Sequence, residues 1–322
     1  MGYGETREVQ MEIKSATEIN RKNYAMNDNS PIFVRGLSRS GGTLMVTILD
    51  AHPDISMSYE LYPNLLEPLI QGKLNINDFF EILSKSRKGK KMERKPENRS
   101  IRIFVNRCPR GGLERKDLIF LLEEHLSSGD GFADSAGCLR FIERCATKKM
   151  MTEGKSQWGL KCNNNFEEYI NIWPRARFLN MVRDGRDVLS SQLNTGSFNK
   201  TPVDVGRGWT NVHKKFRALV DDPRVRAYEV CYERLVCKPE GEVRQICEFL
   251  EVSFDKDILS YYRKDLTIYK ASHLSMDRIR KPVDTSKIGR WKNELSERQL
   301  KEFYSTAMET MTRYGYLENE EI

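Results

Sequence analysis

Several features that define common protein classes are missing from this 322-residue sequence. No apolar run approaches the roughly 18–20 residues of a membrane-spanning helix, and even the apolar stretch 118–122 is bracketed by charges. The first thirty residues are polar and of mixed charge, unlike a signal peptide or an anchor. A chain from which a targeting segment had been removed would look the same. We therefore treat residues 1–30 as a polar N-terminal extension and expect no membrane span.

The cysteines and the net charge exclude further classes of protein. There are seven cysteines, an odd number with no CxxC pair, which argues against a zinc site and weakly favours a reducing compartment. We therefore expect a cytoplasmic protein without a bound metal. The net charge of +7 favours an anionic partner. However, the densest basic stretch, residues 85–95, has no interleaved aromatic side chains, which argues against nucleic-acid binding.

The most informative segment is residues 31–49, where a short apolar strand enters a Gly/Ser/Arg loop that opens an amphipathic helix. Such a loop binds phosphate, because free backbone N–H groups and the positive end of the helix dipole meet there. Its glycine spacing almost matches the P-loop motif G-x4-G-K-[ST], but Gly42 replaces the lysine and the cation is Arg39. This indicates a nucleotide without a β,γ-phosphate pair. The predicted phosphate-binding residues are Ser38, Arg39, Ser40, Gly41, Gly42 and Thr43.

Strand and helix signals alternate along the chain, which predicts a mainly parallel sheet flanked by helices around a P-loop NTPase-like core. The length and the 39% hydrophobic content suit one α/β domain over residues 31–322, with residues 72–100 as an excursion from the core. The predicted strands are Ile32–Leu37, Ile101–Val105, Gln157–Leu160, Arg177–Val182 and Val225–Val230. The predicted helices are Thr43–Asp50, Arg115–Leu126, Ala136–Thr147, Phe166–Ile172, Val188–Asn194, Val203–Val220, Gly241–Leu250, Asp255–Tyr262 and Ser296–Tyr314.

A second strand–loop–helix unit, residues 177–191, carries Arg183 at the end of its strand and Ser191 about two turns into its helix. Both side chains face one point if the helix runs back beneath the end of the strand. An arginine fork with a hydroxyl suits a second phosphate group, away from the first. Taken alone, an Arg-Asp-Gly-Arg turn is more often a salt-bridged loop. Beside the first loop, it indicates a nucleotide that is phosphorylated at two places.

Together these segments resemble the sulfotransferase family, and within it the tyrosylprotein sulfotransferases most closely. The shared motifs include Arg-Ser-Gly-Gly-Thr-Leu-Met, Met-Val-Arg-Asp-Gly-Arg, Tyr-Glu-Arg-Leu-Val and Ser-Met-Asp-Arg-Ile-Arg-Lys-Pro-Val, in the stretches 32–63, 158–194, 228–236 and 272–291. The resemblance implies 3′-phosphoadenosine-5′-phosphosulfate (PAPS) as the sulfuryl donor. In that family the first loop holds the 5′-phosphosulfate and an Arg…Ser pair holds the 3′-phosphate. The product would be adenosine 3′,5′-bisphosphate.

The resemblance also implies roles for individual residues. Arg39 would stabilise the transferred sulfuryl group, and Glu60 would be the general base that takes the proton of the acceptor. Lys161 would hold the bridging oxygen of the leaving group, and Ser275 would contact the phosphosulfate. The predicted catalytic residues are therefore Glu60, Arg39, Lys161 and Ser275. The predicted donor-binding residues outside the loop are Arg183, Ser191, Tyr232 and Lys281, of which Lys281 would contact the 3′-phosphate.

The four histidines compete with Glu60 for the role of base, since many cytosolic sulfotransferases use a histidine. Only His273, two residues before Ser275, remains an alternative base. His52 lies in a motif whose histidine is structural. His125 and His213 lie within charged helices, and we expect both to face solvent.

Three departures limit the resemblance. Ser58 stands where the family has a cysteine, so the disulfide of that cysteine cannot form. Thr195 stands where a further arginine for the 3′-phosphate is expected. Residues 65–157, where an acceptor cleft would be built, match nothing in the family and form a variable acceptor-side region.

The sequence thus predicts in-line transfer of a sulfuryl group from PAPS to the hydroxyl of a small molecule or a peptide tyrosine. A P-loop kinase or hydrolase is one alternative, although Gly42 and the lack of a Walker-B aspartate count against it. A non-catalytic nucleotide-binding scaffold is the other. The sequence leaves open whether the chain forms a homodimer. A Golgi-lumenal catalytic domain lacking its anchor is the alternative to the cytoplasmic location.

Overall fold

The computed structural model describes residues 30–84, 98–162, 166–196, 200–270 and 276–317. Five strands form one sheet in the order β2-β3-β1-β4-β5, and every neighbouring pair is parallel. The central strand pairs on both sides, since Ile32 lies opposite Gly159 and Arg177. This confirms the predicted α/β class. The strands are β1 (Ile32–Arg35), β2 (Ile55–Ser58), β3 (Gln157–Lys161), β4 (Arg177–Val182) and β5 (Arg226–Cys231).

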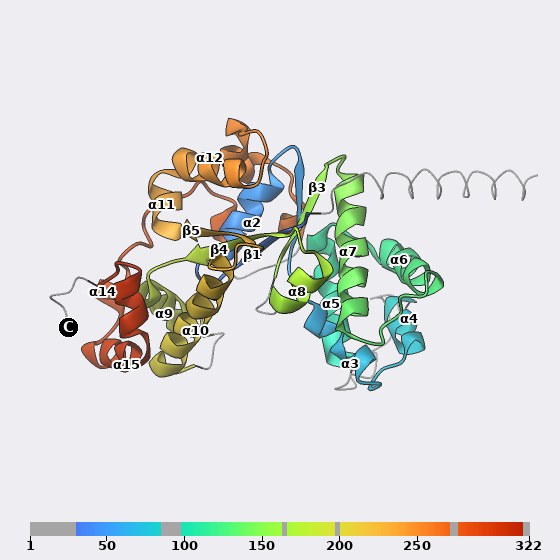
Figure 1. Ribbon diagram of the computed structural model, residues 1–322, viewed down its shortest axis with the longest axis horizontal. Helices are drawn as coiled ribbons and strands as arrows, with labels where there is room; N and C mark the ends of the chain where they lie inside the picture. Colours follow the sequence, from blue (N-terminus) through green and yellow to red (C-terminus); the bar gives the residue numbers. More distant parts are fainter. Residues whose placement is uncertain (1–29, 85–97, 163–165, 197–199, 271–275, 318–322) are drawn as a thin grey trace, which may run out of the picture.

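Helices cover both faces of the sheet and extend beyond its two edges (Figure 1). None of the helices in the described part of the chain combines the length and the apolar character that a membrane crossing requires. The α-helices up to β4 are α2 (Gly42–Asp50), α3 (Glu67–Ile70), α4 (Ile76–Ser84), α5 (Arg99–Arg107), α6 (Arg115–Ser127), α7 (Ser135–Thr152) and α8 (Phe166–Ile172). Those after β4 are α9 (Gly185–Asn194), α10 (Pro202–Val220), α11 (Tyr232–Cys237), α12 (Pro239–Phe249), α13 (Met276–Ile279), α14 (Trp291–Glu294) and α15 (Glu297–Arg313). The 3₁₀ helices are η1 (Pro63–Leu65), η3 (Cys108–Gly111), η4 (Lys256–Arg263) and η5 (Thr267–Lys270).

The central strand contributes to two separate cores, because successive side chains of a strand point to opposite faces. Ile32 and Val34 pack with apolar residues of α2, α11 and α12. Phe33, between them, packs with apolar residues of α4 to α8. A third apolar cluster joins α9, α10 and α15. Since all five strands are parallel, the loops that follow β1, β3 and β4 emerge at the same edge of the sheet, where ligands bind in such folds.

The predicted strand at residues 101–105 is wrong, because these residues lie within helix α5. Ile101, Phe104 and Val105 are the buried residues of that helix. Their spacing of three and four positions is that of one helix face, and it outweighs the β-branched composition that suggests a strand.

Three further differences concern short segments. Strand β2 was not predicted, because its four residues, Ile-Ser-Met-Ser, carry too weak a pattern. The predicted α-helix at 255–262 is the 3₁₀ helix η4. The predicted excursion at 72–100 is also wrong in its first part, since α4 buries Phe79, Ile82 and Leu83 in the core. Residues 85–97 lie outside the described residues.

A buried charge cluster fixes the C-terminal end of α2 to β2 and α7. The ammonium of Lys149 lies 2.6 Å from Oδ1 of Asp50, and both side chains are almost fully buried. The same Asp50 oxygen accepts the backbone N–H of Met57 in β2 at 2.8 Å. Lys149 also contacts Glu153, at 2.8 Å from Oε1. The C-terminal end of α2, the helix that follows the predicted phosphate-binding loop, is therefore held by a charged contact as well as by apolar packing.

Replacing Asp50 should destabilise the fold strongly. In Asp50→Ala, the buried Lys149 loses its buried partner and the N–H of Met57 loses its acceptor, so the free energy of unfolding should fall by about 3 kcal/mol. Urea unfolding of both proteins measures this difference. As a control, Glu309→Ala removes an exposed carboxylate that pairs with Lys214, at 3.1 Å, and should change stability by less than about 1 kcal/mol. Equal effects of the two variants would contradict this account.

Candidate active site

The loop between β1 and α2 has the backbone of an anion-binding turn. The N–H of Ser40 donates to the carbonyl of Leu37 at 3.0 Å, and this bond closes the turn. Gly41 precedes α2 with φ of 98°, in the left-handed region. Because Gly41 has no side chain to cap the helix, the N–H groups of the first turn point toward whatever lies before it. The predicted phosphate-binding loop thus has the conformation that its glycines suggest.

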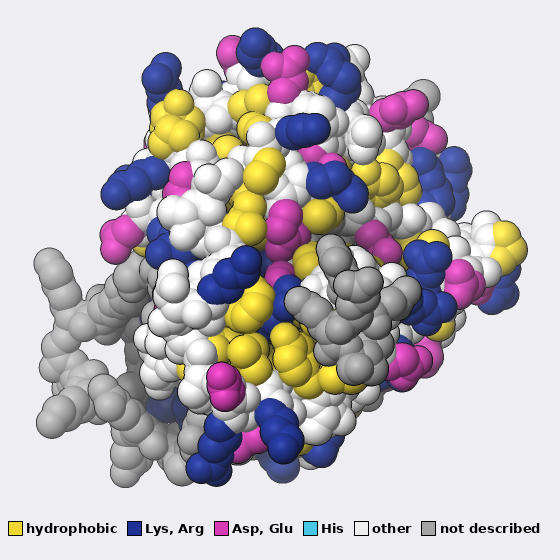
Figure 2. Space-filling view, turned by 90° about the vertical axis from the view of Figure 1, so that its left-hand side faces the viewer, with side chains coloured by type: hydrophobic (Ala, Val, Ile, Leu, Met, Phe, Trp, Pro, Cys, Tyr) yellow, Lys and Arg dark blue, Asp and Glu magenta, His cyan; other side chains and the backbone are white. Residues whose placement is uncertain are grey.

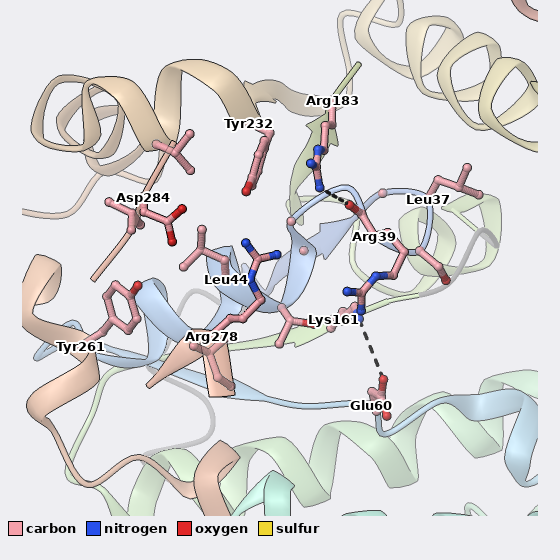
Figure 3. A pocket seen from close by; sticks show the side chains of 18 of the residues that line it. Leu37, Arg39, Leu44, Glu60, Lys161, Arg183, Tyr232, Tyr261, Arg278 and Asp284 are labelled. Carbon is pink, nitrogen blue, oxygen red and sulfur yellow. Dashed lines mark hydrogen bonds and ion pairs between the residues drawn. The ribbon is translucent and has the colours of Figure 1, made fainter. Parts of the chain in front are cut away.

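This loop forms one wall of a pocket of about 440 Å³. Figure 3 shows side chains from several segments converging on it. Five cationic side chains and two acidic ones belong to the lining, so positive charge dominates. The charged lining residues are Arg39, Arg107, Lys161, Arg183, Arg278, Glu60 and Asp284. By contrast, basic and acidic side chains are interspersed on the face of the molecule in Figure 2.

Arg39 links the two segments that the sequence assigns to phosphate groups. Its backbone is in the left-handed region, with φ of 81°. Its Nε donates to Oγ of Ser191 at 3.0 Å, and its carbonyl accepts from NH1 of Arg183 at 3.0 Å. Burial lowers the pKa of Arg39, and the neighbouring guanidinium of Arg278 lowers it further. A bound anion would relieve this repulsion.

Arg183, at the end of β4, is held on several sides. Its guanidinium lies 4.3 Å from the ring centroid of Tyr232, a contact typical of cation–π pairs. NH2 donates to the carbonyl of Lys287 at 2.6 Å and lies 3.8 Å from Oδ2 of Asp187. Arg183 and Tyr232 both line the pocket, so the predicted second anion-binding segment opens into the same pocket as the first.

Lys161 and Thr43 lie next to each other at the floor of the pocket. The ammonium of Lys161 is 3.5 Å from Oγ1 of Thr43 and 3.9 Å from Oε1 of Glu60. Burial is the main cause that lowers the pKa of Lys161. The hydroxyl of Thr43 also lies 3.1 Å from that of Tyr59, the residue before Glu60. A single hydroxyl of the predicted phosphate-binding loop therefore lies next to both Lys161 and the segment of the predicted base.

Glu60 follows β2 and is surrounded by cations. Its Oε2 lies 3.2 Å from NH1 of Arg110 and 3.5 Å from Nε of Arg107. Its backbone φ is 56°, a left-handed conformation that costs an L-residue other than glycine roughly 1–2 kcal/mol. Strained backbone of this kind is concentrated at functional sites. The side chain of Glu60 is 13% exposed and lines the pocket, so a ligand in the pocket can reach it.

The other end of the pocket is mainly apolar. Tyr232 and Val236 come from α11, and Tyr261 comes from η4. The hydroxyl of Tyr261 donates to the carbonyl of Lys281 at 2.7 Å and thereby ties η4 to the segment after α13. An aromatic, apolar wall beside a cationic floor suits a ligand with a flat ring at one end and anionic groups along its length. The apolar wall consists of Leu44, Tyr232, Val236, Tyr261, Ile279, Pro282 and Val283.

Most of the predicted site residues meet in this pocket, and a few do not. The predicted residues that line it are Ser38, Arg39, Gly41, Gly42, Thr43, Glu60, Lys161, Arg183 and Tyr232. Ser40 and Ser191 are buried beside it without lining it. The side chain of Lys281 is exposed and does not belong to the lining either. Ser275 and His273 lie outside the described residues.

Sequence reasoning missed several lining residues, namely Tyr62, Arg107, Tyr261, Arg278, Pro282 and Asp284. Arg278 lies within a stretch that the resemblance already covered, three residues before Lys281. Within that stretch the sequence analysis singled out Ser275 and Lys281, and it did not single out Arg278. Arg107 lies in the variable region, where no local pattern distinguishes it from other surface arginines.

The expectation that His125 and His213 face solvent is wrong, since both are buried. Nε2 of His125 lies 2.9 Å from the carbonyl of Gly131. Nδ1 of His213 lies 3.3 Å from the amide of Asn180, and burial lowers the pKa of His213 to about 3. His52 has the structural contacts that were expected, with its ring nitrogens next to Ser253 and Asp54. None of these three histidines lines the pocket.

The parallel sheet thus has a P-loop-like turn and a cationic pocket at its strand ends, an arrangement that suits a ligand with anionic groups. Residues 31–256, most of the chain, match the sulfotransferase family, so the chain belongs to that family. Protein-tyrosine sulfotransferase A of Caenorhabditis elegans is 26% identical over 310 residues, which cover 92% of this chain and 70% of that protein. The protein-tyrosine sulfotransferase of Drosophila melanogaster is 25% identical, over 88% of this chain but only 51% of its own length. This chain therefore spans about half of the fly protein.

Solved structures agree on the fold. The sulfotransferase domain of the Synechococcus PCC 7002 olefin synthase has a TM-score of 0.57 at 16% identity, covering 87% of this chain and 94% of that domain. The sulfotransferase domain from the curacin biosynthetic pathway has a TM-score of 0.53 at 17% identity, covering 86% of this chain and 96% of that domain. The expected sulfotransferase fold and family are thus confirmed.

Gly41 should not tolerate even a methyl group. A Cβ at this position would lie 2.6 Å from Cδ2 of Tyr232, and its φ of 98° disfavours any L side chain. Gly41→Ala should therefore lower the melting temperature by more than Gly72→Ala. Gly72 has a φ of 64° but open space around it, so its replacement isolates the backbone strain of about 1 kcal/mol. Thermal unfolding of both variants measures the difference, and equal melting temperatures would show that the contact with Tyr232 is unimportant.

Proposed function

We propose that this protein transfers the sulfuryl group of PAPS to a hydroxyl group of an acceptor and releases adenosine 3′,5′-bisphosphate. One observation supports this most strongly. The loop at residues 38–43, all but Ser40, and the side chain of Arg183 line the same pocket, although these two predicted anion-binding segments are far apart in sequence. A ligand with a phosphate at each end of one nucleoside suits that arrangement better than a nucleotide with a single polyphosphate chain.

The donor's two anionic ends have separate partners in this proposal. The 5′-phosphosulfate takes the N-terminus of α2, where backbone N–H groups and Thr43 are accessible. The 3′-phosphate takes the corner formed by Arg183 and Ser191, and the adenosine packs on the apolar wall. The bond between Arg39 and Ser191, at 3.0 Å, then has to be exchanged for bonds to the donor. Arg278, which lines the pocket, adds a cation that the sequence did not identify.

The chemistry follows from the charges around the reacting atoms. The acceptor oxygen forms a bond to sulfur while the bond from sulfur to the phosphate oxygen breaks, and the acceptor's proton passes to Glu60. Negative charge on the sulfuryl and bridging oxygens is stabilised by Arg39 and Lys161, which are fixed in place before the reaction. Ser275 stays a predicted contact of the phosphosulfate. These cations supply the positive charge that magnesium supplies in kinases.

For the acceptor we propose a tyrosine hydroxyl in a peptide ahead of a small molecule. Two relatives that match most of this chain are protein-tyrosine sulfotransferases, and this favours the peptide. The cation Lys161 beside Glu60 is also suited to an acidic acceptor. Oligomeric state and cellular location stay predictions, namely a possible homodimer and a cytoplasmic location with a Golgi-lumenal alternative. All seven cysteines lie in the described part of the chain, and each is a free thiol.

Labelled PAPS tests the reaction directly. The protein should transfer label to tyrosine peptides with acidic flanks in preference to simple phenols and alcohols. Thermal unfolding distinguishes the sulfotransferase from the alternative of a P-loop kinase or hydrolase. Adenosine 3′,5′-bisphosphate should raise the melting temperature of a sulfotransferase, whereas ATP with magnesium would raise that of a kinase. Donor binding without transfer to any acceptor would instead favour the non-catalytic scaffold.

Removing the predicted base or the loop cation should slow the reaction. Glu60→Gln keeps the shape of the side chain but cannot accept the proton, so kcat should fall by about 10²- to 10⁴-fold. Arg39→Ala should reduce kcat by about 10²-fold or more, because a donor to the developing charge is lost. Initial rates at saturating PAPS measure both effects. Arg298→Gln, at an exposed position of α15, serves as the control, and wild-type turnover in Glu60→Gln would refute the assignment of the base.

Arg183 should dominate binding of the product nucleotide. Arg183→Gln removes a charged donor from the corner of the pocket and should weaken adenosine 3′,5′-bisphosphate binding by about tenfold to a hundredfold. Lys281→Gln gives a matched test of the role implied by the resemblance, since Lys281 does not line the pocket. Isothermal calorimetry measures both affinities. We expect Arg183→Gln to lose more affinity, because Arg183 lines the pocket and Lys281 does not. A larger loss of affinity in Lys281→Gln would contradict this expectation.

A further inference from the structure

We propose that Arg107 and Arg110 are positioning residues for Glu60, which they hold in the orientation that its role as base requires. The inference rests on the proposed function, because it takes Glu60 as the proton acceptor. Both arginines belong to the region 65–157, for which the sequence showed no counterpart in the family. That region would then do more than shape an acceptor cleft, since it would also set the geometry of the base.

The two arginines contact the same oxygen of the Glu60 carboxylate. NH1 of Arg110 donates to Oε2 of Glu60 at 3.2 Å, and Nε of Arg107 lies 3.5 Å from the same oxygen. The second oxygen, Oε1, is the one that faces Lys161, at 3.9 Å. Contacts of both arginines with one oxygen restrict the rotation of the carboxylate and thereby keep Oε1 on the side of Lys161.

Each arginine also packs on one of the tyrosines that flank Glu60. The guanidinium carbon of Arg110 lies 5.9 Å from the ring centroid of Tyr59, and that of Arg107 lies 5.4 Å from the ring centroid of Tyr62. Between these contacts the chains are close together, because a Cβ on Gly111 would lie 3.1 Å from Cδ1 of Leu61. Residues 107–111 therefore run along residues 59–62 and contact them repeatedly.

The segment that carries the arginines is itself fixed by local hydrogen bonds. The thiol of Cys108 donates to the carbonyl of Phe104 at 3.2 Å, and the N–H of Leu113 donates to the carbonyl of Cys108 at 3.0 Å. Fixed donors lose little conformational entropy when they bind the carboxylate. Glu60, with its left-handed φ of 56°, needs such support, because strained conformations persist only where the surroundings determine them.

The competing role for these arginines is direct recognition of an anionic acceptor. A double-mutant cycle separates the two roles, because a residue that acts through Glu60 has no effect once Glu60 is gone. Arg110→Gln should reduce kcat by about tenfold to a hundredfold and change the acceptor KM by less than about threefold. In the Glu60→Gln background the same substitution should cause no further loss of kcat. Arg110→Lys should recover only part of the rate, since lysine keeps the charge without the planar fork.

The pH profile gives a second readout. Arg107, Arg110, Lys161, Tyr59 and Tyr62 face the carboxylate, and the cations among them favour its ionised form. Arg110→Gln should therefore move the acidic limb of the kcat profile to higher pH. Arg99→Gln is the control, because Arg99 is an exposed arginine of α5, the helix that directly precedes η3, and its replacement should leave both kcat and the acidic limb unchanged.

Three outcomes would overturn the proposal. The first is a full loss from Arg110→Gln in the Glu60→Gln background, which would assign the arginine to the acceptor. The second is a change in KM with unchanged kcat. The third is wild-type turnover in Glu60→Gln, which would show that Glu60 is not the base, although the protein would still transfer sulfuryl groups. If no sulfuryl transfer occurs, the proposed function fails. The contact between Arg110 and Glu60 can still be tested by a double-mutant cycle measured through melting temperatures. Absence of coupling between the two residues in that cycle would refute the positioning role.

Discussion

The concentration of positive charge in a half-buried pocket is the constraint on which the site depends. Arg39, Lys161 and Arg183 lie on the loops and strand ends of β1, β3 and β4, where a parallel sheet brings them to one edge. Burial and the repulsion from neighbouring cations lower the pKa of Arg39, so holding these cations together is electrostatically unfavourable. Apolar packing of β1 and α2, together with the contact of Asp50 with Lys149, holds the elements that carry the loop in place.

The two halves of the proposed reaction are physically connected in this arrangement. The hydroxyl of Thr43 belongs to the loop that would hold the donor, and it contacts Tyr59, the neighbour of Glu60. Lys161 lies within reach of both Thr43 and Glu60. A shift of the loop on binding a nucleotide would therefore be felt at the carboxylate through two short contacts. The donor and acceptor sides of the pocket form one network.

Local sequence signals predicted what is locally determined. The glycine loop and the Arg183 turn are each encoded within about a dozen residues, and they took the expected conformations at the expected edge of the sheet. The sheet itself followed from the alternation of strand and helix patterns. The short helix α5 and strand β2 did not, because so few residues leave helical and strand patterns hard to distinguish.

What depends on distant contacts was not predictable. Burial of His125 and His213 is decided by neighbours such as Gly131 and Asn180 that sequence spacing does not reveal. Arg107 reaches Glu60 across 47 positions of the chain, in a region without a recognisable pattern. At residues 278–281 the resemblance found the right segment, but the side chain that lines the pocket is Arg278 and not Lys281.

The left-handed backbone of Glu60 has a consequence for how this chain responds to selection. Glycine adopts that conformation without steric penalty, and asparagine does so more easily than glutamate. In a library screened only for thermal robustness, Glu60→Gly would therefore be enriched even though it discards the carboxylate. Under the proposed function, position 60 is therefore one where robustness and chemistry oppose each other, and a glutamate at this position favours chemistry.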